Sequence, residues 1–457
     1  MEEFQAIIIG SGQAGNPLAH NLADSGWKVA LIEREHMGGS CINYGCTPTK
    51  TMLASAQLAH YARRAPDFGV QAGPVRVNLA DVVARKNKLV HDWRAGQEHH
   101  AASRPNITLY RGEARFTGPR TVTVNDEELT ASHIFINTGT GPLVLPIEGI
   151  EAVPYLTNRN IMDLTAVPEH LLVIGGSYIG LEFGQMFRRF GSHVTVVEYM
   201  AQLIPREDAD VASALQTALE AEGIQFHLNS QATKVEQAAD GSLRLTVQPR
   251  DGGPARTLAG SHILLAAGRS PNTDGLGLEA AGVETRRGWI PVNEYLETNV
   301  PGVYALGDVN GGPAFTHIAY NDFQIAFHNL LNGDKRSTAG RIVPYALFTD
   351  PELGRVGMTE KEARAAGHAI KVGTIPMEWV ARAIERDETA GLMKVVVDAA
   401  TDRILGAAIL GAGGAELVQT LMALMMADAP WTLFHKAVYI HPTLTEGFFS
   451  LMDNVKA

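Results

Sequence analysis

The sequence predicts an α/β protein made of two related strand–turn–helix–strand units followed by a C-terminal α+β domain. A short apolar run leading into a glycine-rich turn and a helical pattern occurs near residue 4 and again near residue 171, which predicts the paired units. After a polar stretch at 332–338 the pattern changes to strands and helices without such a turn, which predicts the last domain. A length of 457 residues suits about three domains, since one domain takes roughly 100–200 residues.

The composition indicates a folded, acidic chain. Hydrophobic residues make up 45% and charged residues 19%, which excludes a disordered protein. Lys and Arg number 38 against 49 Asp and Glu, a net charge of −11, so nothing indicates binding to nucleic acid or an anionic membrane. The chain has no run of about 18 apolar residues and no positively charged secretory start. We expect a cytoplasmic protein that acts on a small molecule.

The first unit begins with an apolar run at residues 4–9, which predicts a buried strand. Gly10, Gly12 and Gly15 follow in a G-x-G-x-x-G pattern, and a second strand ends at Glu33. The first glycine permits a tight turn, the second lets the backbone approach a pyrophosphate, and the third lets helix and strand pack closely. The pyrophosphate would lie at the helix N-terminus, and Glu33 would bind ribose hydroxyls. The unit predicts a Rossmann-like dinucleotide-binding domain.

A second copy starts with a strand at 171–174 and continues with Gly175, Ser177 and Gly180. In both copies the acid lies 23 residues after the first glycine (33 − 10 and 198 − 175), and such a repeat is stronger than one motif. Ser177 replaces the middle glycine and should crowd the phosphate without abolishing the site. Glu198 would bind a ribose diol and repel a 2′-phosphate, and no Arg follows it directly. NADH is therefore favoured, and NADPH is possible.

Each unit is followed by a buried-strand pattern that ends in a small residue and a glycine, at 133–139 and 262–268. In the last domain, Thr359 and Glu362 have capping-box spacing and predict a helix start. Strands are predicted at 392–397 and 404–409. Proline-containing stretches at 141–146 and 269–272 and the polar run at 332–338 mark joints, which divide the chain into segments 1–150, 151–270, 271–340 and 341–457.

The only two cysteines, Cys41 and Cys46, lie five residues apart in segment 38–50, GGSCINYGCTPTK. In a regular helix this spacing separates the Cα atoms by roughly 8.6 Å, beyond the disulfide limit of about 7 Å. A bond between them needs a distorted turn, which Gly45 and Pro48 make plausible. Such a bond would be reducible, which favours catalytic use. The alternatives are two inert thiols or half of a metal site, and no HExxH pattern or second cysteine pair supports a metal.

Six ordered motifs together resemble the two-cysteine flavoprotein disulfide reductases, the family of dihydrolipoyl dehydrogenase, glutathione reductase and mercuric reductase. Besides the two glycine turns and the cysteine segment, the matching stretches are VYALGDV at 303–309, VGMTE at 356–360 and HPTLTE at 441–446. The resemblance covers essentially the whole chain. It implies a homodimer with FAD bound by the first domain, NAD(P)H bound by the second, and a C-terminal domain that serves dimerisation.

The resemblance also implies catalytic roles. Cys46 is the thiolate against the flavin, and Cys41 is the outer thiol that exchanges with substrate. His441 comes from the other subunit and moves protons, and Glu446 orients its imidazole. The remaining implied catalytic pair is Lys50, near flavin N5, with Glu182.

The implied cofactor-binding residues extend beyond the two turns. Asp308 contacts the flavin side of FAD, and Tyr178 covers the flavin until the nicotinamide displaces it. The full set comprises Gly10, Gly12, Gly15, Glu33, Gly39, Ser40, Lys50, Thr138, Gly139, Asp308, Gly175, Ser177, Tyr178, Gly180, Glu198 and Gly268.

No metal site is predicted. The Met-rich stretch at 421–426 has helical spacing and should form a packed core or a dimer face. His99 and His100 should be solvated on a helix.

Within the family, several residues narrow the substrate. The tail at 448–457 has no cysteine, and His441 is present, which argues against mercuric reduction. Thr47-Pro48-Thr49-Lys50 departs from the Ile-Pro-Ser-Lys of dihydrolipoyl dehydrogenase. The cysteine segment with LIPRED at 203–208 looks more like the branch of hypothiocyanous acid and reactive chlorine reductases.

We therefore expect an FAD-dependent oxidoreductase that passes electrons from NAD(P)H through flavin and the Cys41–Cys46 disulfide to a small disulfide or reactive sulfur or oxidant substrate. The alternatives are dihydrolipoyl dehydrogenase, a metal-ion reductase resembling mercuric reductase, diaphorase or oxidase activity without the thiols, and a flavin redox sensor without turnover. The sensor ranks below the enzymes because it would leave His441, Glu446 and the nicotinamide site without a purpose.

Overall fold

The computed structural model describes residues 2–456, and the chain forms two compact units, each assembled from three segments. The first unit comprises the chain up to Met52 together with Ala80–Leu143 and Gly268–Arg341. The second comprises Leu53–Leu79, Val144–Ala267 and the chain from Ile342 onward.

The first unit is organised around a parallel sheet centred on β1 (Glu2–Ile9). The parallel strands follow the order β3-β2-β1-β6, β17 pairs in parallel with the end of β6, and β4 and β5 extend the sheet antiparallel. The remaining bounds are β2 (Val29–Glu33), β3 (Ile107–Arg111), β4 (Arg115–Gly118), β5 (Thr121–Val124), β6 (Glu127–Ile136) and β17 (Val303–Ala305).

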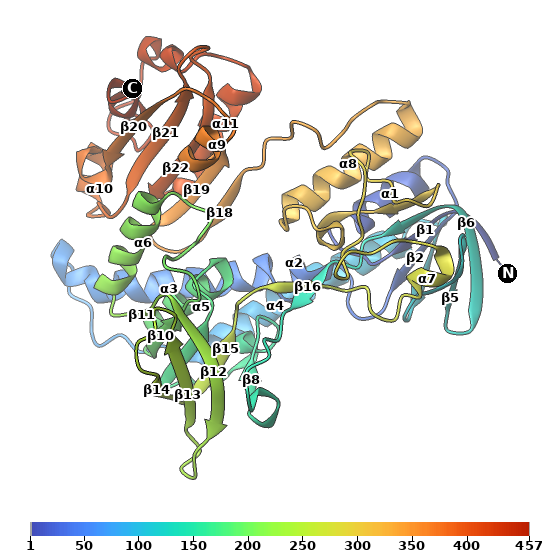
Figure 1. Cartoon of the computed structure of the whole chain (residues 1–457), viewed down its shortest axis with the longest axis horizontal. Helices are drawn as coiled ribbons and strands as arrows, with labels where there is room; N and C mark the ends of the chain where they lie inside the picture. Colours follow the sequence, from blue (N-terminus) through green and yellow to red (C-terminus); the bar gives the residue numbers. More distant parts are fainter. Residues whose placement is uncertain (1, 457) are drawn as a thin grey trace. The chain divides into compact units, whose positions relative to one another are not determined.

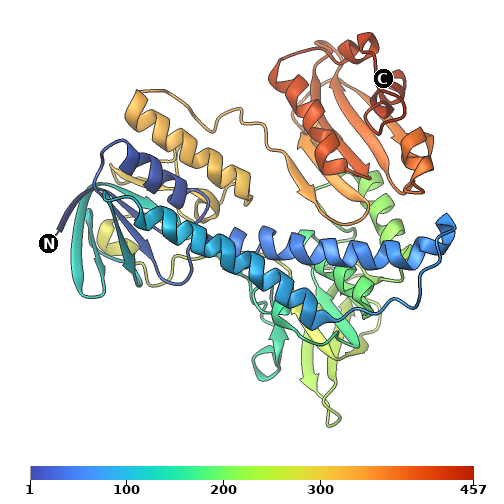
Figure 2. The ribbon, with the colours of Figure 1, turned by 180° about the vertical axis from the view of Figure 1, so that it is seen from behind.

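Alternate residues of β1 pack on opposite faces of this sheet. Ala6 and Ile8 pack with α1 (Gly15–Asp24) and α8 (Thr316–Asn332), which lie side by side in Figures 1 and 2. Ile7 belongs to the core on the other face. The other elements that lie in this unit, wholly or in part, are α2 (Gly39–Asn43), α3 (Cys46–Arg64), α4 (Leu79–Ala102), β7 (Thr140–Pro142), β16 (Arg269–Pro271), α7 (Leu278–Ala281) and η4 (Gly307–Asn310).

The second unit contains a five-stranded parallel sheet of order β11-β10-β9-β15-β8. Helix α5 (Tyr178–Phe190) packs on β9 and β10, and an antiparallel sheet of order β12-β13-β14 adjoins them. The bounds are β8 (Tyr155–Leu156), β9 (His170–Ile174), β10 (His193–Val197), α6 (Ala209–Ala221), β11 (Gln225–His227), β12 (Ser230–Gln237), β13 (Leu243–Pro249), β14 (Arg256–Gly260) and β15 (His262–Leu265), with η2 (Ile150–Ala152) and η3 (Ile161–Asp163) before them.

The C-terminal part of the second unit is an antiparallel sheet of order β18-β19-β22-β21-β20. Helices α11 and α12 share one core with this sheet, and α9 packs on residues of the opposite face. The bounds are β18 (Tyr345–Leu347), β19 (Glu352–Gly357), α9 (Glu360–Ala365), β20 (Ile370–Pro376), η5 (Met377–Trp379), α10 (Ala381–Glu385), β21 (Leu392–Asp398), β22 (Ile404–Gly411), α11 (Gly414–Met426), η6 (Trp431–Lys436) and α12 (Gly447–Asp453).

The structure confirms the α/β fold class and the local predictions. Thr359 and Glu362 form a complete capping box at the start of α9, and the two predicted C-terminal strands are β21 and β22. The Met-rich stretch lies in α11, where Leu421 is buried and Met425 packs against the same core. His99 and His100 are exposed on α4, as predicted. No helix within residues 2–456 is both long and apolar enough to cross a membrane.

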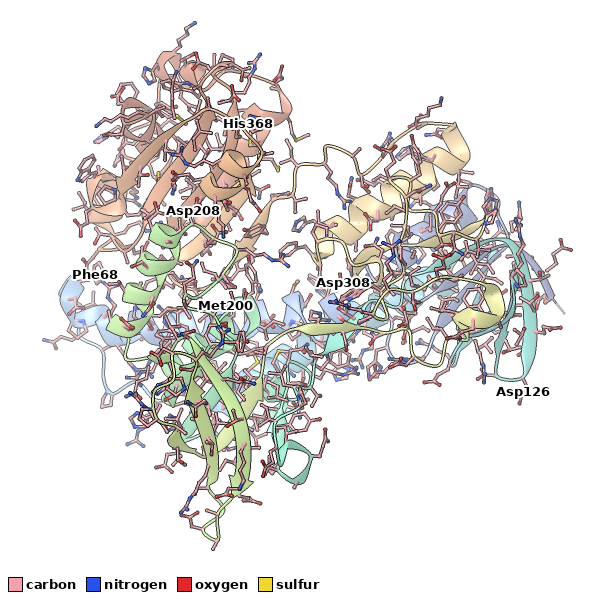
Figure 3. The ribbon with its side chains drawn as sticks, in the orientation of Figure 1. Phe68, Asp126, Met200, Asp208, Asp308 and His368 are labelled. Atoms are coloured by element: carbon pink, nitrogen blue, oxygen red, sulfur yellow. The ribbon has the colours of Figure 1, made fainter. Side chains whose placement is uncertain are left out.

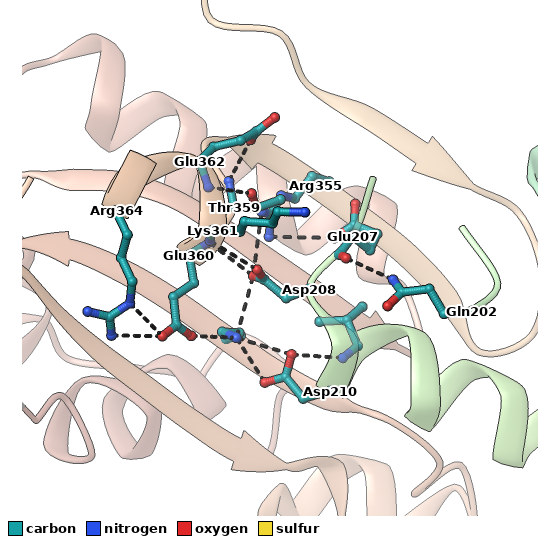
Figure 4. Close-up of polar contacts among 12 residues, drawn as sticks. Gln202, Glu207, Asp208, Asp210, Arg355, Thr359, Glu360, Lys361, Glu362 and Arg364 are labelled. Atoms are coloured by element: carbon teal, nitrogen blue, oxygen red, sulfur yellow. Dashed lines mark hydrogen bonds and ion pairs between the residues drawn. The ribbon is translucent and has the colours of Figure 1, made fainter. Parts of the chain in front are cut away.

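A buried ionic cluster joins the loop after β10 to the C-terminal sheet within the second unit (Figure 4). Arg355 on β19 is 0% exposed and lies 3.6 Å from a Glu207 oxygen and 3.8 Å from an Asp208 oxygen. Burial raises the pKa of Glu207, while the charge of Arg355 and a hydrogen bond from the Tyr345 hydroxyl act against that rise. Lys394 on β21 completes the cluster by pairing with Asp208, Asp210 and Glu360 at 3.4, 2.9 and 3.0 Å.

Replacing Glu207 by Ala should destabilise the protein by about 3–5 kcal/mol, because removing one partner leaves a buried charge uncompensated. The shift of the urea unfolding midpoint measures this loss. The control is Glu236→Ala, which removes an exposed pair with Lys234 and should cost no more than about 1 kcal/mol. Unfolding of the Glu207 variant at the wild-type midpoint would contradict an energetic role for the cluster.

Candidate active site

The first glycine turn connects β1 to α1 through a close approach of backbone to backbone. A Cβ atom on Gly15 would lie 2.1 Å from the Gly10 carbonyl oxygen, and one on Gly39 would lie 2.6 Å from the Gly12 Cα. Only glycine allows these contacts, so the helix, the turn and the start of the cysteine segment pack without intervening side chains. The predicted role of Gly15 in close helix–strand packing is confirmed.

Glu33 at the end of β2 holds this turn in place. Its Oε2 accepts hydrogen bonds from the Ser11 N–H at 3.0 Å and the Ser11 hydroxyl at 2.7 Å, and its Oε1 accepts from the Glu35 N–H at 2.9 Å. A carboxylate has acceptor capacity for about four hydrogen bonds. Glu33 therefore shapes the turn and keeps capacity for a ribose hydroxyl, the role predicted for it.

The residues around this turn fit a dinucleotide such as FAD. Helix α1 has no side-chain cap and no acidic residue in its first turn, as an anion-binding N-terminus requires. The buried Thr138 hydroxyl has no hydrogen-bond partner in the structure, so it is available to a ligand. Asn272 fixes the segment by donating from its side chain to the Thr138 carbonyl at 2.9 Å and from its N–H to the Gly139 carbonyl at 3.0 Å. Local sequence patterns do not predict this role of Asn272, because Asn272 and Thr138 lie 134 positions apart.

A second polar network surrounds Asp308 in η4, which is labelled in Figure 3. The Thr140 hydroxyl donates to Asp308 at 2.8 Å and accepts from Arg269 Nε at 2.6 Å. Burial lowers the pKa of Arg269, while the negative charges of Asp308 and Cys46 act against this change. Thr140 and Arg269 were not predicted as site residues, because their partners lie far away in the sequence.

The two cysteines lie on either side of a helix break. Cys41 is in α2, which ends at Asn43, and Cys46 opens α3. Tyr44 has φ −141° and ψ 6°, and a Cβ on Gly45 would lie 2.9 Å from the Ser40 carbonyl oxygen. The predicted distorted turn is confirmed, and both cysteines are present as free thiols.

The two thiols interact, and their electrostatic surroundings differ. The pKa of Cys41 is raised, first by its hydrogen bond with Cys46, then by burial and by the charge of Cys46. The proton of Cys41 is therefore harder to remove than that of an isolated thiol. The Cys46 sulfur lies 3.3 Å from the Thr316 hydroxyl. Cys46 is also the first residue of the 19-residue helix α3, whose N-terminus favours negative charge. Lys50 follows one turn after Cys46 in α3.

The second glycine turn reproduces the first. A Cβ on Gly180 would lie 1.9 Å from the Gly175 carbonyl oxygen. Glu198 accepts hydrogen bonds from the Gly176 N–H at 2.6 Å and the Met200 N–H at 2.7 Å, as Glu33 does from Ser11 and Glu35. Ser177 occupies the cap position of α5 with extended backbone. Gly268 follows β15 and accepts a hydrogen bond from the Leu143 N–H.

Tyr178 and Glu182 project from the first turns of α5. The Tyr178 ring packs edge to face on Tyr345, with 5.8 Å between ring centroids, and burial raises the pKa of Tyr178 to about 12. Glu182 is 6% exposed and accepts a hydrogen bond from the Phe348 N–H at 3.0 Å. The pairing of Glu182 with Lys50 stays a prediction, as does the movement of Tyr178 over a flavin.

His441 and Glu446 form a pair in the C-terminal domain. Nδ1 of His441 lies 3.0 Å from Oε2 and 3.2 Å from Oε1 of Glu446. The His441 side chain is 73% exposed and that of Glu446 only 20%, so a fixed carboxylate orients an accessible imidazole. Both line an open pocket of about 320 Å³ with Trp379, Tyr439 and Phe449.

Two nucleotide-binding turns and an interacting thiol pair define a pyridine nucleotide-dependent flavoprotein with a redox-active cysteine centre. The family model "pyridine nucleotide-disulphide oxidoreductase" matches residues 4–322, and the model of that family's dimerisation domain matches residues 343–451. The chain belongs to the pyridine nucleotide-disulphide oxidoreductase family.

Three similar proteins illustrate its relationships. The chain is 37% identical to the probable pyridine nucleotide-disulfide oxidoreductase RclA of Escherichia coli, over 100% of both chains. It is 37% identical to dihydrolipoyl dehydrogenase of Thermus scotoductus, over 99% of this chain and 97% of the relative. It is 34% identical to mercuric reductase of Lysinibacillus sphaericus, over 91% and 76%.

Solved structures agree with these relationships. The HOCl-induced flavoprotein disulfide reductase RclA of Escherichia coli has a TM-score of 0.89 at 36% identity, with 99% of this chain and 100% of that chain covered. Its Cu(II) complex has a TM-score of 0.90 at 36% identity and 99% coverage of both. The predicted resemblance, the fold class and the assignment as an FAD-containing, NAD(P)H-dependent oxidoreductase are confirmed.

Substitution of the third glycine in each turn should impair one nucleotide site and leave the other intact. Gly15→Ala should yield protein that loses FAD on gel filtration, and Gly180→Ala should yield yellow protein that NADH reduces at least tenfold more slowly. Both effects are expected because the added methyl group clashes with a backbone carbonyl oxygen, at a strain cost of about 1–3 kcal/mol. Absorbance spectra and anaerobic stopped-flow reduction measure the two effects.

The control is Gly96→Ala in α4, where nothing lies within 4 Å of the added Cβ. It should retain FAD and reduction by NADH. Equal loss of FAD in the Gly15 and Gly180 variants would contradict the division of roles between the turns.

Proposed function

We propose that the enzyme carries electrons from NAD(P)H to the Cys41–Cys46 pair and on to a small oxidised substrate, a disulfide or a reactive chlorine or sulfur species. The interaction of two thiols across a helix break, in the same unit as the first nucleotide turn, is the observation that supports this most directly. Bound FAD supplies the exchange between a two-electron hydride donor and the thiol pair.

The two cysteines divide the work. Reduction of the Cys41–Cys46 bond takes up two electrons and one proton, which together equal the hydride that NAD(P)H donates. The sulfur–sulfur bond breaks and leaves Cys46 as thiolate and Cys41 as thiol. Thr316 stabilises charge on Cys46 through its hydroxyl, and the N-terminus of α3 adds to that effect. Cys41 must lose its proton before it attacks a substrate, because the thiolate is the nucleophile.

A base is therefore needed beside Cys41, and we assign this role to His441 of the partner subunit in a homodimer. Glu446 fixes the imidazole through Nδ1, so Nε2 is left to take the proton and later return it to the leaving group. The match to a dimerisation domain at 343–451 supports the shared site.

The proposed binding sites follow the domain division. The first domain, 1–150 with 271–340, binds FAD through the Gly10 turn, Glu33, Thr138 and Asp308. The second domain, 151–270, binds the nicotinamide nucleotide through the Gly175 turn and Glu198, and residues 341–457 form the interface. We place Lys50 and Glu182 beside the flavin and Tyr178 over it. Gly39, Ser40, Gly139 and Gly268 belong to the walls of these sites.

The descriptions of one relative support a small oxidant as the electron acceptor of this enzyme. The relative RclA is described as HOCl-induced, and a structure of its Cu(II) complex is known. We therefore rank reactive chlorine products and hypothiocyanous acid first and Cu(II) second.

The test of this function is anaerobic titration of the yellow protein with NADH, followed by a screen of acceptors. We expect flavin bleaching and then a long-wavelength band from a thiolate beside oxidised flavin. Hypothiocyanous acid should be turned over faster than lipoamide, glutathione disulfide or Cu(II), and Cys41→Ser should remove that turnover. Colourless protein that does not take up FAD, or full turnover by the Cys41 variant, would contradict the proposal.

His441→Ala should lower turnover with disulfide substrates by about 10²–10⁴-fold, the usual contribution of a general base. Flavin reduction by NADH should stay near the wild-type rate, because that step precedes proton transfer at Cys41. The matched control is His435→Ala, which alters an exposed histidine 3.5 Å from Asp453. Equal loss of both steps in the His441 variant would contradict the role of His441.

Mixed dimers extend this measurement to the shared site. Refolding the Cys41→Ser and His441→Ala chains together should restore about one quarter of wild-type turnover, because half of the random dimers are mixed and each holds one complete site. No recovery would place the histidine in the same subunit as its cysteine.

A further inference from the structure

An exposed aromatic–cation pair lies next to the second nucleotide turn. Tyr199 and Met200 directly follow Glu198 at the carboxyl end of β10 and are 49% and 44% exposed. Met200 is labelled in Figure 3. The guanidinium carbon of Arg250 lies 3.8 Å from the centre of the Tyr199 ring. Binding of a ribose by Glu198 does not account for this pair.

Backbone hydrogen bonds place Arg250 there. The Asn229 N–H donates to the Met200 carbonyl and the Arg250 N–H donates to the Asn229 carbonyl, both at 2.8 Å. The Ser230 N–H donates to the Glu198 carbonyl at 2.9 Å. The loops after β10, before β12 and after β13 are thereby joined, so a residue 52 positions after Glu198 (250 − 198) becomes its neighbour.

The Arg250 side chain is oriented as well as placed. Its Nη1 donates to the Tyr199 carbonyl at 3.2 Å and to the Asn229 side-chain oxygen at 3.4 Å, while the ring covers one face of the guanidinium. Arginine has five N–H donors in a planar fork, so Nε and Nη2 keep donors for an anion. The neighbouring Asp251 carboxylate is turned to the Gly253 N–H at 3.1 Å.

Glu198 is less of an obstacle to an anion than its charge suggests. It is 7% exposed, and its two oxygens already accept the Gly176 and Met200 N–H groups at 2.6 and 2.7 Å. Those dipoles offset part of the negative charge at the ribose. In open α/β sheets the nucleotide lies beyond the carboxyl ends of the parallel strands, where β9, β10 and β15 end together.

We propose that Arg250, seated on Tyr199, binds the adenosine 2′-phosphate of NADPH and so lets the enzyme use NADPH as well as NADH. The inference rests on the proposed nicotinamide nucleotide site. No arginine directly follows Glu198 in the sequence, but the fold brings Arg250, which directly follows β13, close to it. Arginine suits this role because its fork binds phosphate oxygens in pairs.

The test compares two fragments of the coenzyme on the FAD-containing protein, 2′,5′-ADP and 5′-AMP, by isothermal titration calorimetry. Arg250→Ala should weaken 2′,5′-ADP by about 10–100-fold, the usual range for one charge-assisted contact. Binding of 5′-AMP should change less than twofold, and KM for NADPH should rise while KM for NADH stays constant. Arg250→Lys should fall between wild type and the alanine variant.

The control is Arg244→Ala, an exposed arginine on β13, the strand that ends just before Arg250; this variant should leave binding of both fragments unaffected. Equal weakening of both fragments by Arg250→Ala would show that Arg250 stacks on adenine, and no change would show that it does not reach the nucleotide. Either result overturns the proposal. Wild-type protein that binds no 2′,5′-ADP also overturns it, whether or not NADH reduces the flavin. The proposed function is judged separately, by FAD uptake, by flavin reduction with NADH and by the Cys41 variant.

Discussion

A carboxylate that binds the backbone of a glycine turn is the interaction on which the rest of this structure depends. It occurs twice, as Glu33 with Ser11 and as Glu198 with Gly176. Each acid lies at the carboxyl end of the strand that follows its glycine turn and helix: Glu33 ends β2, and Glu198 directly follows β10. The bond therefore ties the end of that strand to the turn that follows the preceding parallel strand, β1 or β9. The helix N-terminus that follows is then fixed relative to the sheet, which a phosphate-binding site needs.

The same constraint reaches the cysteines. Gly39 approaches the Cα of Gly12 so closely that no side chain fits between them, so the segment that carries the thiols starts against the glycine turn. Helix α2 lasts five residues, and the break at Tyr44 and Gly45 lets Cys46 open a new helix. A continuous helix would hold the sulfurs apart. Redox chemistry at this pair is thus a consequence of where the chain cannot remain helical.

Local patterns in the sequence were sufficient for the strands around the two glycine turns, for β6, β15, β21 and β22, for both turns, for the capping box at Thr359 and for the helix break. Each of these depends on residues a few positions apart. The sequence predicts that Glu33 and Glu198 bind ribose hydroxyls. It does not predict that their carboxylates also accept hydrogen bonds from the backbone of the glycine turns. Arg269 with Thr140, Asn272 with Thr138, and Arg250 with Tyr199 join residues more than 50 positions apart. Periodicity carries no information about such contacts, which arise only when sheets bring loops together.

The electrostatics of the thiol pair explain why a two-cysteine centre also needs a histidine. The hydrogen bond with Cys46, burial and the charge of Cys46 all raise the pKa of Cys41, so the proton of Cys41 is hard to remove. The retained proton keeps the outer sulfur unreactive, so reduction alone does not produce a nucleophile. In the proposed mechanism, the exposed His441 imidazole held by Glu446 removes that proton when a substrate arrives. On this proposal, attack on an oxidant would depend on assembly of the dimer as well as on reduction of the thiol pair.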